Sequence, residues 1–247
     1  MYSETAHFYG FFDSDRSETE KRVRFISQFL ESKSQALIDI GAGNGEMAFR
    51  FANLGHKIHC LEPSQPMHAI LLERLAHRSD LHLKVSAYPF LMEDLKLSLQ
   101  ANVAYASSVF SHLNFDARLS LVKSLKSHLL KNGLFIFNGV RQISGRTDKP
   151  LTLLAEKKVG DVTYRHFDSA EQIGVDKRRV NWRFETESPF SEKQVFEESF
   201  LLNLDDSDSI QKLLAESGFE LIEEFGSWEK EDRDKTKPGM VIVARSR

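Results

Sequence analysis

The sequence of 247 residues contains a single cysteine, Cys60, together with six prolines and two tryptophans. One cysteine excludes an intramolecular disulfide and a cysteine-cluster metal site, so we expect no metal and a buried Cys60 thiol in an apolar strand. No apolar run is long enough to span a bilayer, and the first ten residues lack the charged and then apolar order of a secretory signal. These absences favour a protein of the reducing cytoplasm, without a membrane segment.

The chain also lacks an excess of charge of either sign. It has 33 Lys and Arg against 36 Asp and Glu, a formal net charge of −3. The basic signature that marks many nucleic-acid-binding chains is therefore missing. Acidic residues concentrate after residue 215, where they disfavour a grip on a phosphate backbone. The charge pattern disfavours a nucleic-acid partner without excluding one.

Segments typical of strands and helices alternate through the first half, which predicts a doubly wound α/β fold with a parallel sheet between helices. The end of the chain adds a helix and two more strands. We expect strands at 36–40, 57–61, 81–85, 102–106, 134–137, 219–225 and 240–244, and helices starting near 17, 46, 64, 116 and 209.

The pattern changes after residue 144. Gly145, Asp148, Lys149 and Pro150 are typical of a loop, and polar–apolar alternation then predicts antiparallel strands at 162–167, 180–184 and 196–204. We predict a core made of 1–144 and 205–247, and a β-rich insertion at 145–204. The insertion is too small to build a large core of its own, so we expect it to act as a lid.

The most informative stretch is Ile38-Asp39-Ile40-Gly41-Ala42-Gly43-Asn44-Gly45. Glycines between a strand and a helix let the backbone turn tightly and approach a ligand closely. Glu62 ends the next predicted strand, 21 residues after Gly41. In such a fold a carboxylate at this place accepts hydrogen bonds from ribose hydroxyls. The pattern predicts a site for a nucleotide cofactor.

Two common nucleotide sites do not fit this loop. The dinucleotide fingerprint requires a third glycine five residues after the first, where this chain has Glu46, whose charge would face a pyrophosphate. A Walker phosphate loop needs Gly-Lys-Ser/Thr, which does not follow.

Five ordered elements resemble the class I S-adenosylmethionine (SAM) methyltransferases, in particular the branch of sugar amine N-methyltransferases. They are the glycine loop, Glu62-Pro63-Ser64-Gln65-Pro66-Met67, the stretch 104–113, Leu129-Leu130-Lys131-Asn132-Gly133 and Ala215-Glu216-Ser217-Gly218-Phe219. The resemblance covers roughly 20–140 and 205–245. It implies a mostly parallel seven-stranded sheet, with SAM as cofactor and S-adenosylhomocysteine as product.

The resemblance also implies which residues bind the cofactor. Asp39 and the glycines surround the methionine and ribose of SAM, and Glu62 holds the ribose. Ser86 stands where the family often has an acidic residue that reads the adenine. We expect cofactor contacts from Tyr9, Asp39, Gly41, Ala42, Gly43, Gly45, Glu62, Pro63, Met67, Ser86, Ala87 and Ser107.

His112 follows the fourth predicted strand and is the candidate catalytic base, because imidazole titrates near neutral pH. We expect the insertion to form the acceptor pocket rather than part of the cofactor site, with substrate contacts from Tyr164, His166, Trp182 and Arg183. Transfer to a nitrogen or oxygen of a small molecule is the main interpretation. An RNA or protein methyltransferase and a SAM-binding protein without turnover stay open, as do a monomer and a homodimer.

The glycine spacing and Glu46 predict that the protein binds SAM and S-adenosylhomocysteine but not NAD. Calorimetric titration with the three ligands tests this. Tighter binding of NAD than of either SAM species would contradict the assignment.

Overall fold

The computed structural model describes residues 4–12, 17–31, 34–95, 100–140, 148–232, 234 and 239–247. Its helices are α1 (Ala6–Phe12), α2 (Ser17–Ser27), α3 (Glu46–Asn53), α4 (Gln65–Ala76), α5 (Phe115–Ser127) and α6 (Ser207–Glu216), with short 3-10 turns η1 (Ser79–Leu81), η2 (Met92–Asp94) and η3 (Phe110–His112). Its strands are β1 (Ala36–Ile40), β2 (Lys57–Leu61), β3 (Val85–Tyr88), β4 (Ala101–Ala106), β5 (Leu129–Val140), β6 (Lys149–Val159), β7 (Val162–Ile173), β8 (Lys177–Ser188), β9 (Ser191–Asn203), β10 (Phe219–Phe225) and β11 (Gly239–Ser246).

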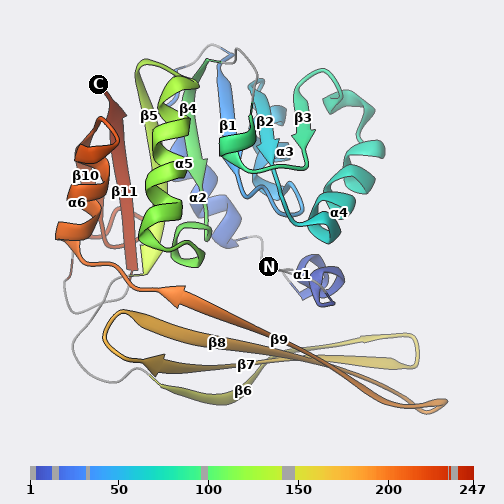
Figure 1. Cartoon of the computed structure of the whole chain (residues 1–247). Helices are drawn as coiled ribbons and strands as arrows, with labels where there is room; N and C mark the ends of the chain where they lie inside the picture. Colours follow the sequence, from blue (N-terminus) through green and yellow to red (C-terminus); the bar gives the residue numbers. More distant parts are fainter. Residues whose placement is uncertain are drawn as a thin grey trace.

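A seven-stranded sheet has the order β10-β11-β5-β4-β1-β2-β3 (Figure 1). Strands β1 to β5 pair in parallel, and β11 pairs antiparallel to both β5 and β10. This confirms the predicted doubly wound, mostly parallel sheet. The strand order reverses between β1 and β4, and ligands of such sheets bind at the carboxyl ends of the strands on either side of that point. Gly41 and Ser107 begin the loops there.

Helices cover both faces of this sheet (Figure 1). Leu121, Val122 and Leu125 of α5 pack with residues of α6 on one face. On the other face Phe25 and Phe51, from α2 and α3, pack against strand residues that include Cys60, a free and buried thiol. None of the helices that the structure describes is long and apolar enough to cross a membrane.

A separate antiparallel sheet, β6-β7-β8-β9, lies below the carboxyl edge of the large sheet, and α1 lies between the two (Figure 1). The aromatic side chains of α1 join it to this sheet. The Phe8 ring stacks on Phe184 with centroids 4.7 Å apart, and the Phe11 and Phe12 rings contact Tyr164 and His166. The small sheet therefore packs one face on α1.

Three local predictions are wrong. The third strand starts at Val85 rather than at Leu81, because residues 81–84 form a turn in which Lys84 N–H donates to the Leu81 carbonyl at 2.8 Å. Strand β6 is not predicted, and a loop is expected at its start; Pro150 is tolerated there because β6 is an edge strand. Helix α1 is not predicted either, because Gly10 interrupts its short pattern. The predicted Gly145 loop lies largely outside the described residues.

Gly45 is a glycine of the turn after β1 that no other residue could replace without both backbone strain and a steric clash. Its φ is +79°, and a Cβ there would lie 2.3 Å from Leu71 Cδ1. Gly160 has a φ of +58° but no atom within 4 Å of such a Cβ. We expect Gly160→Ala to lower the free energy of unfolding by about 1–2 kcal/mol through left-handed backbone strain alone. Gly45→Ala should cost about 1–3 kcal/mol more, because it also overpacks the core.

Urea unfolding of the two variants tests this difference. Equal losses would mean that Leu71 moves aside freely, and the turn would then be less tightly packed than the structure shows.

Candidate active site

The turn between β1 and α3 crosses the end of β2. The N–H groups of Gly41 and Ala42 both donate to the Leu61 carbonyl, at 2.8 and 3.1 Å. Gly41 has a φ of +69°, and a Cβ there would lie 2.4 Å from Val109 Cγ2. The loop after β4 therefore packs directly on this turn, and a larger residue at position 41 would separate the two walls of the site.

Glu62 lies at the end of β2 and is 5% exposed. Its Oε2 accepts a hydrogen bond from Gly43 N–H at 2.7 Å, and its Oε1 accepts one from Ser64 N–H at 2.8 Å. Burial raises the pKa of the carboxyl group, and these two N–H donors oppose that rise. Each carboxylate oxygen can accept a further bond, so Glu62 can hold a ribose hydroxyl while it orders the loop.

Asp39 lies on β1 and lines a small cavity of about 60 Å³, together with Tyr9, Arg22, Asn44 and Ser107. It is 3% exposed, and its Oδ2 has no hydrogen-bond partner among the described residues. Burial raises its pKa to about 7; the nearby Tyr105 hydroxyl lowers it and the Glu62 charge raises it further. A buried carboxylate oxygen without a partner fits a bound ammonium group, such as that of the methionine part of SAM.

A larger cavity of about 320 Å³ adjoins this one at the reversal point of the sheet. It brings together Tyr9, Gly41, Gly43, Glu62, Pro63, Met67 and Ser107 of the predicted cofactor residues, and it is also lined by His112. Ala42 lines the small cavity with Asp39. Gly45 lines neither, because it faces Leu71 and Phe49 instead.

The structure does not place Ser86 and Ala87 at these cavities. Both lie within β3, where Ser86 is exposed and Ala87 packs against the core under α3 and α4. The loop after β3 takes their expected place, with Phe90, Leu91 and Met92 lining the larger cavity. The expected placement of Ser86 and Ala87 followed from a predicted third strand that ends at Val85, whereas β3 begins there. Pro89, which follows β3, is the signal that could have marked the correct end.

Arg22 on α2 is a further residue of the site that the sequence pattern does not predict. It lines the small cavity beside Asp39, and its Nε is buried without a hydrogen-bond partner among the described residues. An arginine in this state suits a carboxylate, which it can bind through paired N–H donors. Nothing in the sequence separates Arg22 from its neighbours Lys21 and Arg24, because the helix pattern does not say which basic residue faces the site.

His112 ends η3, in the loop after β4. The loop is held by Ser108, which has a φ of +59° and whose N–H donates to Asn138 Oδ1 at 2.7 Å. Burial lowers the pKa of His112, so the ring is neutral at pH 7 and can accept a proton. Its ring lies edge-on to Phe200 of β9, with centroids 5.6 Å apart.

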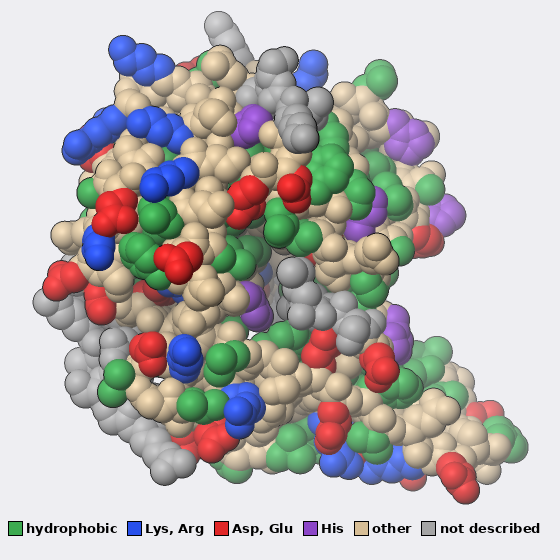
Figure 2. Space-filling model, viewed as in Figure 1, with side chains coloured by type: hydrophobic (Ala, Val, Ile, Leu, Met, Phe, Trp, Pro, Cys, Tyr) green, Lys and Arg blue, Asp and Glu red, His purple; other side chains and the backbone are tan. Residues whose placement is uncertain are grey.

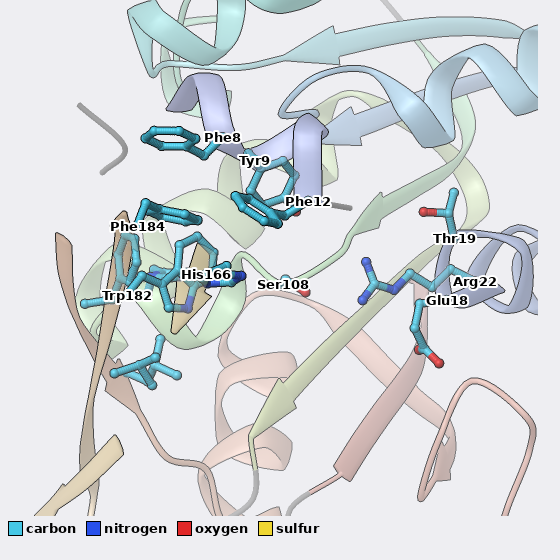
Figure 3. A pocket seen from close by; sticks show the side chains of 14 residues that line it. Phe8, Tyr9, Phe12, Glu18, Thr19, Arg22, Ser108, His166, Trp182 and Phe184 are labelled. Atoms are coloured by element: carbon cyan, nitrogen blue, oxygen red, sulfur yellow. The ribbon is translucent and has the colours of Figure 1, made fainter. Parts of the chain in front are cut away.

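A third cavity, of about 390 Å³, lies between the core and the small sheet (Figure 3). Its walls are mainly aromatic: Phe8, Tyr9, Phe12, His166, Trp182, Phe184 and Phe200. It shares Tyr9, Ser108, His112 and Phe200 with the cavity of about 320 Å³. The two spaces thus adjoin along a wall that includes His112.

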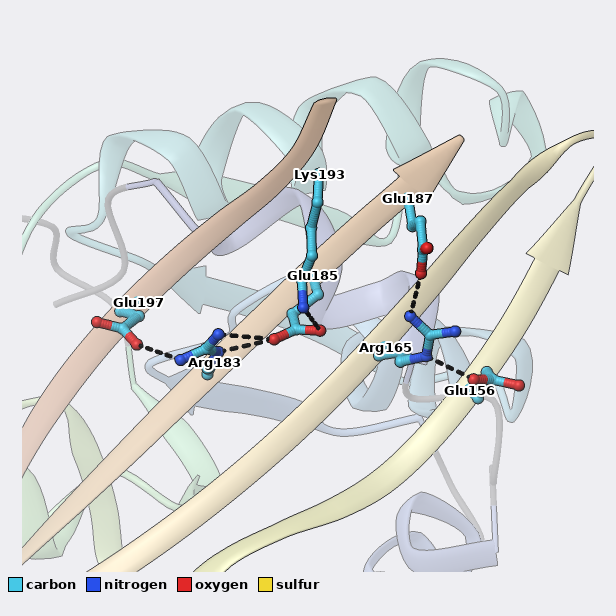
Figure 4. A network of polar contacts seen from close by, with 7 residues as sticks. All are labelled: Glu156, Arg165, Arg183, Glu185, Glu187, Lys193 and Glu197. Atoms are coloured by element: carbon cyan, nitrogen blue, oxygen red, sulfur yellow. Dashed lines mark hydrogen bonds and ion pairs between the residues drawn. The ribbon is translucent and has the colours of Figure 1, made fainter. Parts of the chain in front are cut away.

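The predicted substrate residues separate into two groups. His166 and Trp182 line the aromatic cavity (Figure 3). Tyr164 lies farther along β7 against the Phe11 ring and does not line it. Arg183 does not line it either, because successive residues of a strand point to opposite faces. Arg183 pairs with Glu185 and Glu197 instead (Figure 4).

The small sheet also lines the cavity of about 320 Å³. Ser199, Phe200 and Leu201 of β9 are part of its wall. The expected division, in which the insertion serves the acceptor alone, is therefore incomplete. Tyr9 on α1 lines all three cavities, and the next residue, Gly10, lies beside Asn44 of the glycine turn.

Residues 38–135 match the family model described as "Methyltransferase domain". No protein with a curated description matches the chain by sequence. Similar solved structures are the CcbJ methyltransferase of Streptomyces caelestis (TM-score 0.77, 19% identity, 98% of this chain and 96% of that one), DesVI of Streptomyces venezuelae (0.78, 16%, 100% and 100%) and the sugar N-methyltransferase KedS8 of Streptoalloteichus sp. ATCC 53650 (0.79, 16%, 100% and 94%). At these identities the likeness establishes the fold.

The chain has the fold of these methyltransferases, and its residues 38–135 match a methyltransferase domain. The unpartnered Asp39 oxygen and the buried Glu62 carboxylate are acidic groups at its cavities.

The raised pKa of Asp39 predicts a pH-dependent affinity for S-adenosylhomocysteine. We expect the ligand's ammonium group to bind the ionised Asp39 carboxylate, for which a proton competes. With a pKa of about 7 in the free protein, the affinity should fall about tenfold between pH 8 and pH 6. Calorimetry across this range measures it.

Asp39→Asn should bind more weakly at pH 8 and lose most of the pH dependence. Glu46→Gln is the matched control, because Glu46 lines the same small cavity but already pairs with Arg74 at 2.5 Å. A flat profile in the unchanged protein, or an undiminished slope in Asp39→Asn, would show that Asp39 does not meet the ammonium group.

Proposed function

We propose that this protein transfers the methyl group of SAM to a nitrogen of a small-molecule acceptor that binds in the aromatic cavity under the four-stranded sheet. The observation that carries the proposal is the meeting of the two cavities at His112. Tyr9, Ser108 and Phe200 belong to the same shared wall, so a molecule in the cofactor cavity and one in the aromatic cavity would lie next to each other there.

Under this proposal each part of the cofactor has a partner in the chain. Asp39 takes the ammonium group and Arg22 the carboxylate of the methionine part. Glu62 takes the ribose hydroxyls. Phe90, Leu91 and Met92 line the larger cavity together with Pro63 and Met67 and enclose the adenine.

The sulfonium of SAM supplies an electrophilic methyl group, whose C–S bonding electrons return to sulfur as the acceptor nitrogen forms its new bond. The chain's own task is alignment, which is the largest contribution to such transfers. The aromatic walls exclude water and orient the acceptor. The neutral His112 imidazole receives the proton that the nitrogen loses, a contribution of about 10²–10⁴-fold in rate where the nucleophile must be deprotonated.

The walls also indicate the size and chemistry of the acceptor. Glu18 and Arg22 are the charged side chains among the described residues that line the aromatic cavity. Rings on several sides suit a compact molecule with an apolar face, and they also stabilise a cationic amine over their faces. KedS8, which shares this fold, is named a sugar N-methyltransferase, and an amine on a small ring fits the cavity here.

The charge distribution supports a small acceptor over a polynucleotide. Side chains of both signs are interspersed over the core and the small sheet in the face that Figure 2 shows. A polynucleotide would require a basic track along its phosphates. Screening amine-bearing small molecules with isotopically labelled SAM, and reading methylated products by mass spectrometry, tests the proposal. Label transferred only to RNA or protein, or to no acceptor although SAM binds, would contradict it.

The cavity walls predict how two variants behave. Trp182→Ala and His166→Ala should leave the dissociation constant for S-adenosylhomocysteine within about twofold to threefold, because both residues line the aromatic cavity and not the cofactor cavity. Turnover of the acceptor should fall about tenfold or more, because a poorly aligned acceptor loses rate steeply.

Arg183→Gln is the matched control. It changes the residue next to Trp182, but on the opposite face of β8, where Arg183 pairs with Glu185 at 2.8 Å. Turnover should be unchanged. A large loss of cofactor affinity in folded Trp182→Ala would show that the small sheet closes on the cofactor instead.

A further inference from the structure

A buried arginine joins the core to the small sheet at the far side of the active site. Arg118 on α5 is 5% exposed and lines none of the three cavities described above. Its Nε donates to the Phe110 carbonyl at 2.8 Å, and its Nη1 donates to the Asp205 carboxylate. Its Nη2 donates to the Asn203 carbonyl at 3.4 Å. One guanidinium therefore contacts two parts of the chain that lie far apart in sequence.

Those two parts carry adjoining walls of the aromatic cavity, where the His112 and Phe200 rings are in contact. Phe110 begins η3, the turn that ends at His112. Asn203 is the last residue of β9, the strand that also carries Phe200 and Leu202 of the cavity wall. A second bond links the same segments, because Asn203 Nδ2 donates to the Ser111 carbonyl at 3.2 Å.

Asp205, the partner of Arg118, also joins the small sheet to the large one. Asp205 N–H donates to the carbonyl of Val140, the last residue of β5, at 2.8 Å. The chain leaves the core after Val140 and returns to it at Asp205, so both passages lie side by side here. The Arg118 guanidinium thus holds the His112 turn against Asp205, where the chain returns from the small sheet to the core.

We propose that Arg118 is a positioning residue, which sets the His112 turn relative to the four-stranded sheet so that the two adjoining walls of the aromatic cavity keep a fixed arrangement. This inference rests on the proposed function for the meaning of that arrangement. It assigns Arg118 no contact with substrate or cofactor.

The chemistry of the pair favours this role over simple stabilisation. A buried ion pair contributes little net stability, because both charges lose their hydration. The planar guanidinium, however, presents donors in several fixed directions, which a carboxylate and two carbonyls can occupy together. A lysine carries the same charge on a single nitrogen and lacks this rigid fork.

Arg118→Lys is therefore the decisive variant, because it retains the charge opposite Asp205 and loses the fork. Hydrogen–deuterium exchange with bound S-adenosylhomocysteine should show faster exchange confined to 107–114 and 199–206. The dissociation constant for S-adenosylhomocysteine should stay within about twofold to threefold. Turnover should fall about tenfold to a hundredfold, with KM for the acceptor changing more than affinity for the cofactor.

Arg179→Lys is the matched control, because Arg179 forms an exposed ion pair with Glu171 on the same small sheet. It should change neither exchange nor turnover. Asn203→Ala provides an independent variant if Arg118→Lys does not fold. It removes only the donor to Ser111 and should loosen the same two segments.

Unchanged exchange at 107–114 in folded Arg118→Lys would overturn the proposal. Faster exchange spread evenly over the core would also overturn it, because Arg118 would then be a general stabilising residue. If the unchanged protein fails to bind S-adenosylhomocysteine, the proposed function is wrong, and the exchange comparison without ligand still decides whether Arg118 couples the two segments.

Discussion

The cavities at the carboxyl edge of the large sheet depend on the buried carboxylate of Glu62. It accepts hydrogen bonds from Gly43, in the turn after β1, and from Ser64, at the start of α4. The N–H of Glu62 itself donates to the Tyr88 carbonyl at the end of β3, at 3.0 Å. One residue at the end of β2 therefore joins the segments that follow three neighbouring strands. A buried charge requires such donors, and here they also arrange the cavity wall before any ligand binds.

The other half of the site is built on the strands beyond the reversal point. Val109 packs on Gly41, and the left-handed Ser108 is held by Asn138 of β5. Because the glycine turn and the loop after β4 touch directly, the position of His112 depends on the same packing that shapes the cofactor cavity. This packing explains why His112, which the sequence marks only as a histidine after a strand, lines two cavities.

The parts of the fold that could be predicted from sequence are those with a local physical signal. The glycines at 41, 43 and 45 have positive φ values of 69°, 57° and 79°, and the turn that requires them is visible in their spacing. Glu62 follows from the same pattern, because the end of the next parallel strand reaches the same edge. Ser86 fails as a candidate because its placement depended on a strand boundary, the least certain feature of a sequence pattern.

Other parts of the site depend on tertiary contacts that no local pattern contains. Arg22 has the same helical context as its basic neighbours, and its partner-free Nε arises only because α2 packs beside the glycine turn. By contrast, the separation of Trp182 from Arg183 follows the periodicity of a strand, in which neighbouring side chains point to opposite faces of the sheet. The sequence itself therefore favours one of these two residues over the other as a substrate contact.

The two faces of the small sheet explain why it belongs to the active site. Its outer face carries ion pairs across strands, in which Arg165 joins Glu156 and Glu187, each at 2.6 Å (Figure 4). Exposed pairs of this kind contribute little to stability. The inner face supplies the buried rings, such as Phe184, which is 2% exposed under Phe8 of α1.

A four-stranded sheet with one apolar face must cover that face to be stable. Here α1 and the loop that carries His112 provide the cover, and the space left between them is the aromatic cavity. The packing that stabilises the small sheet and the walls that receive the acceptor are thus made by the same side chains. A change that loosens α1 would consequently weaken the sheet and open the aromatic cavity together, and it would also displace Tyr9 from the walls of the other two cavities.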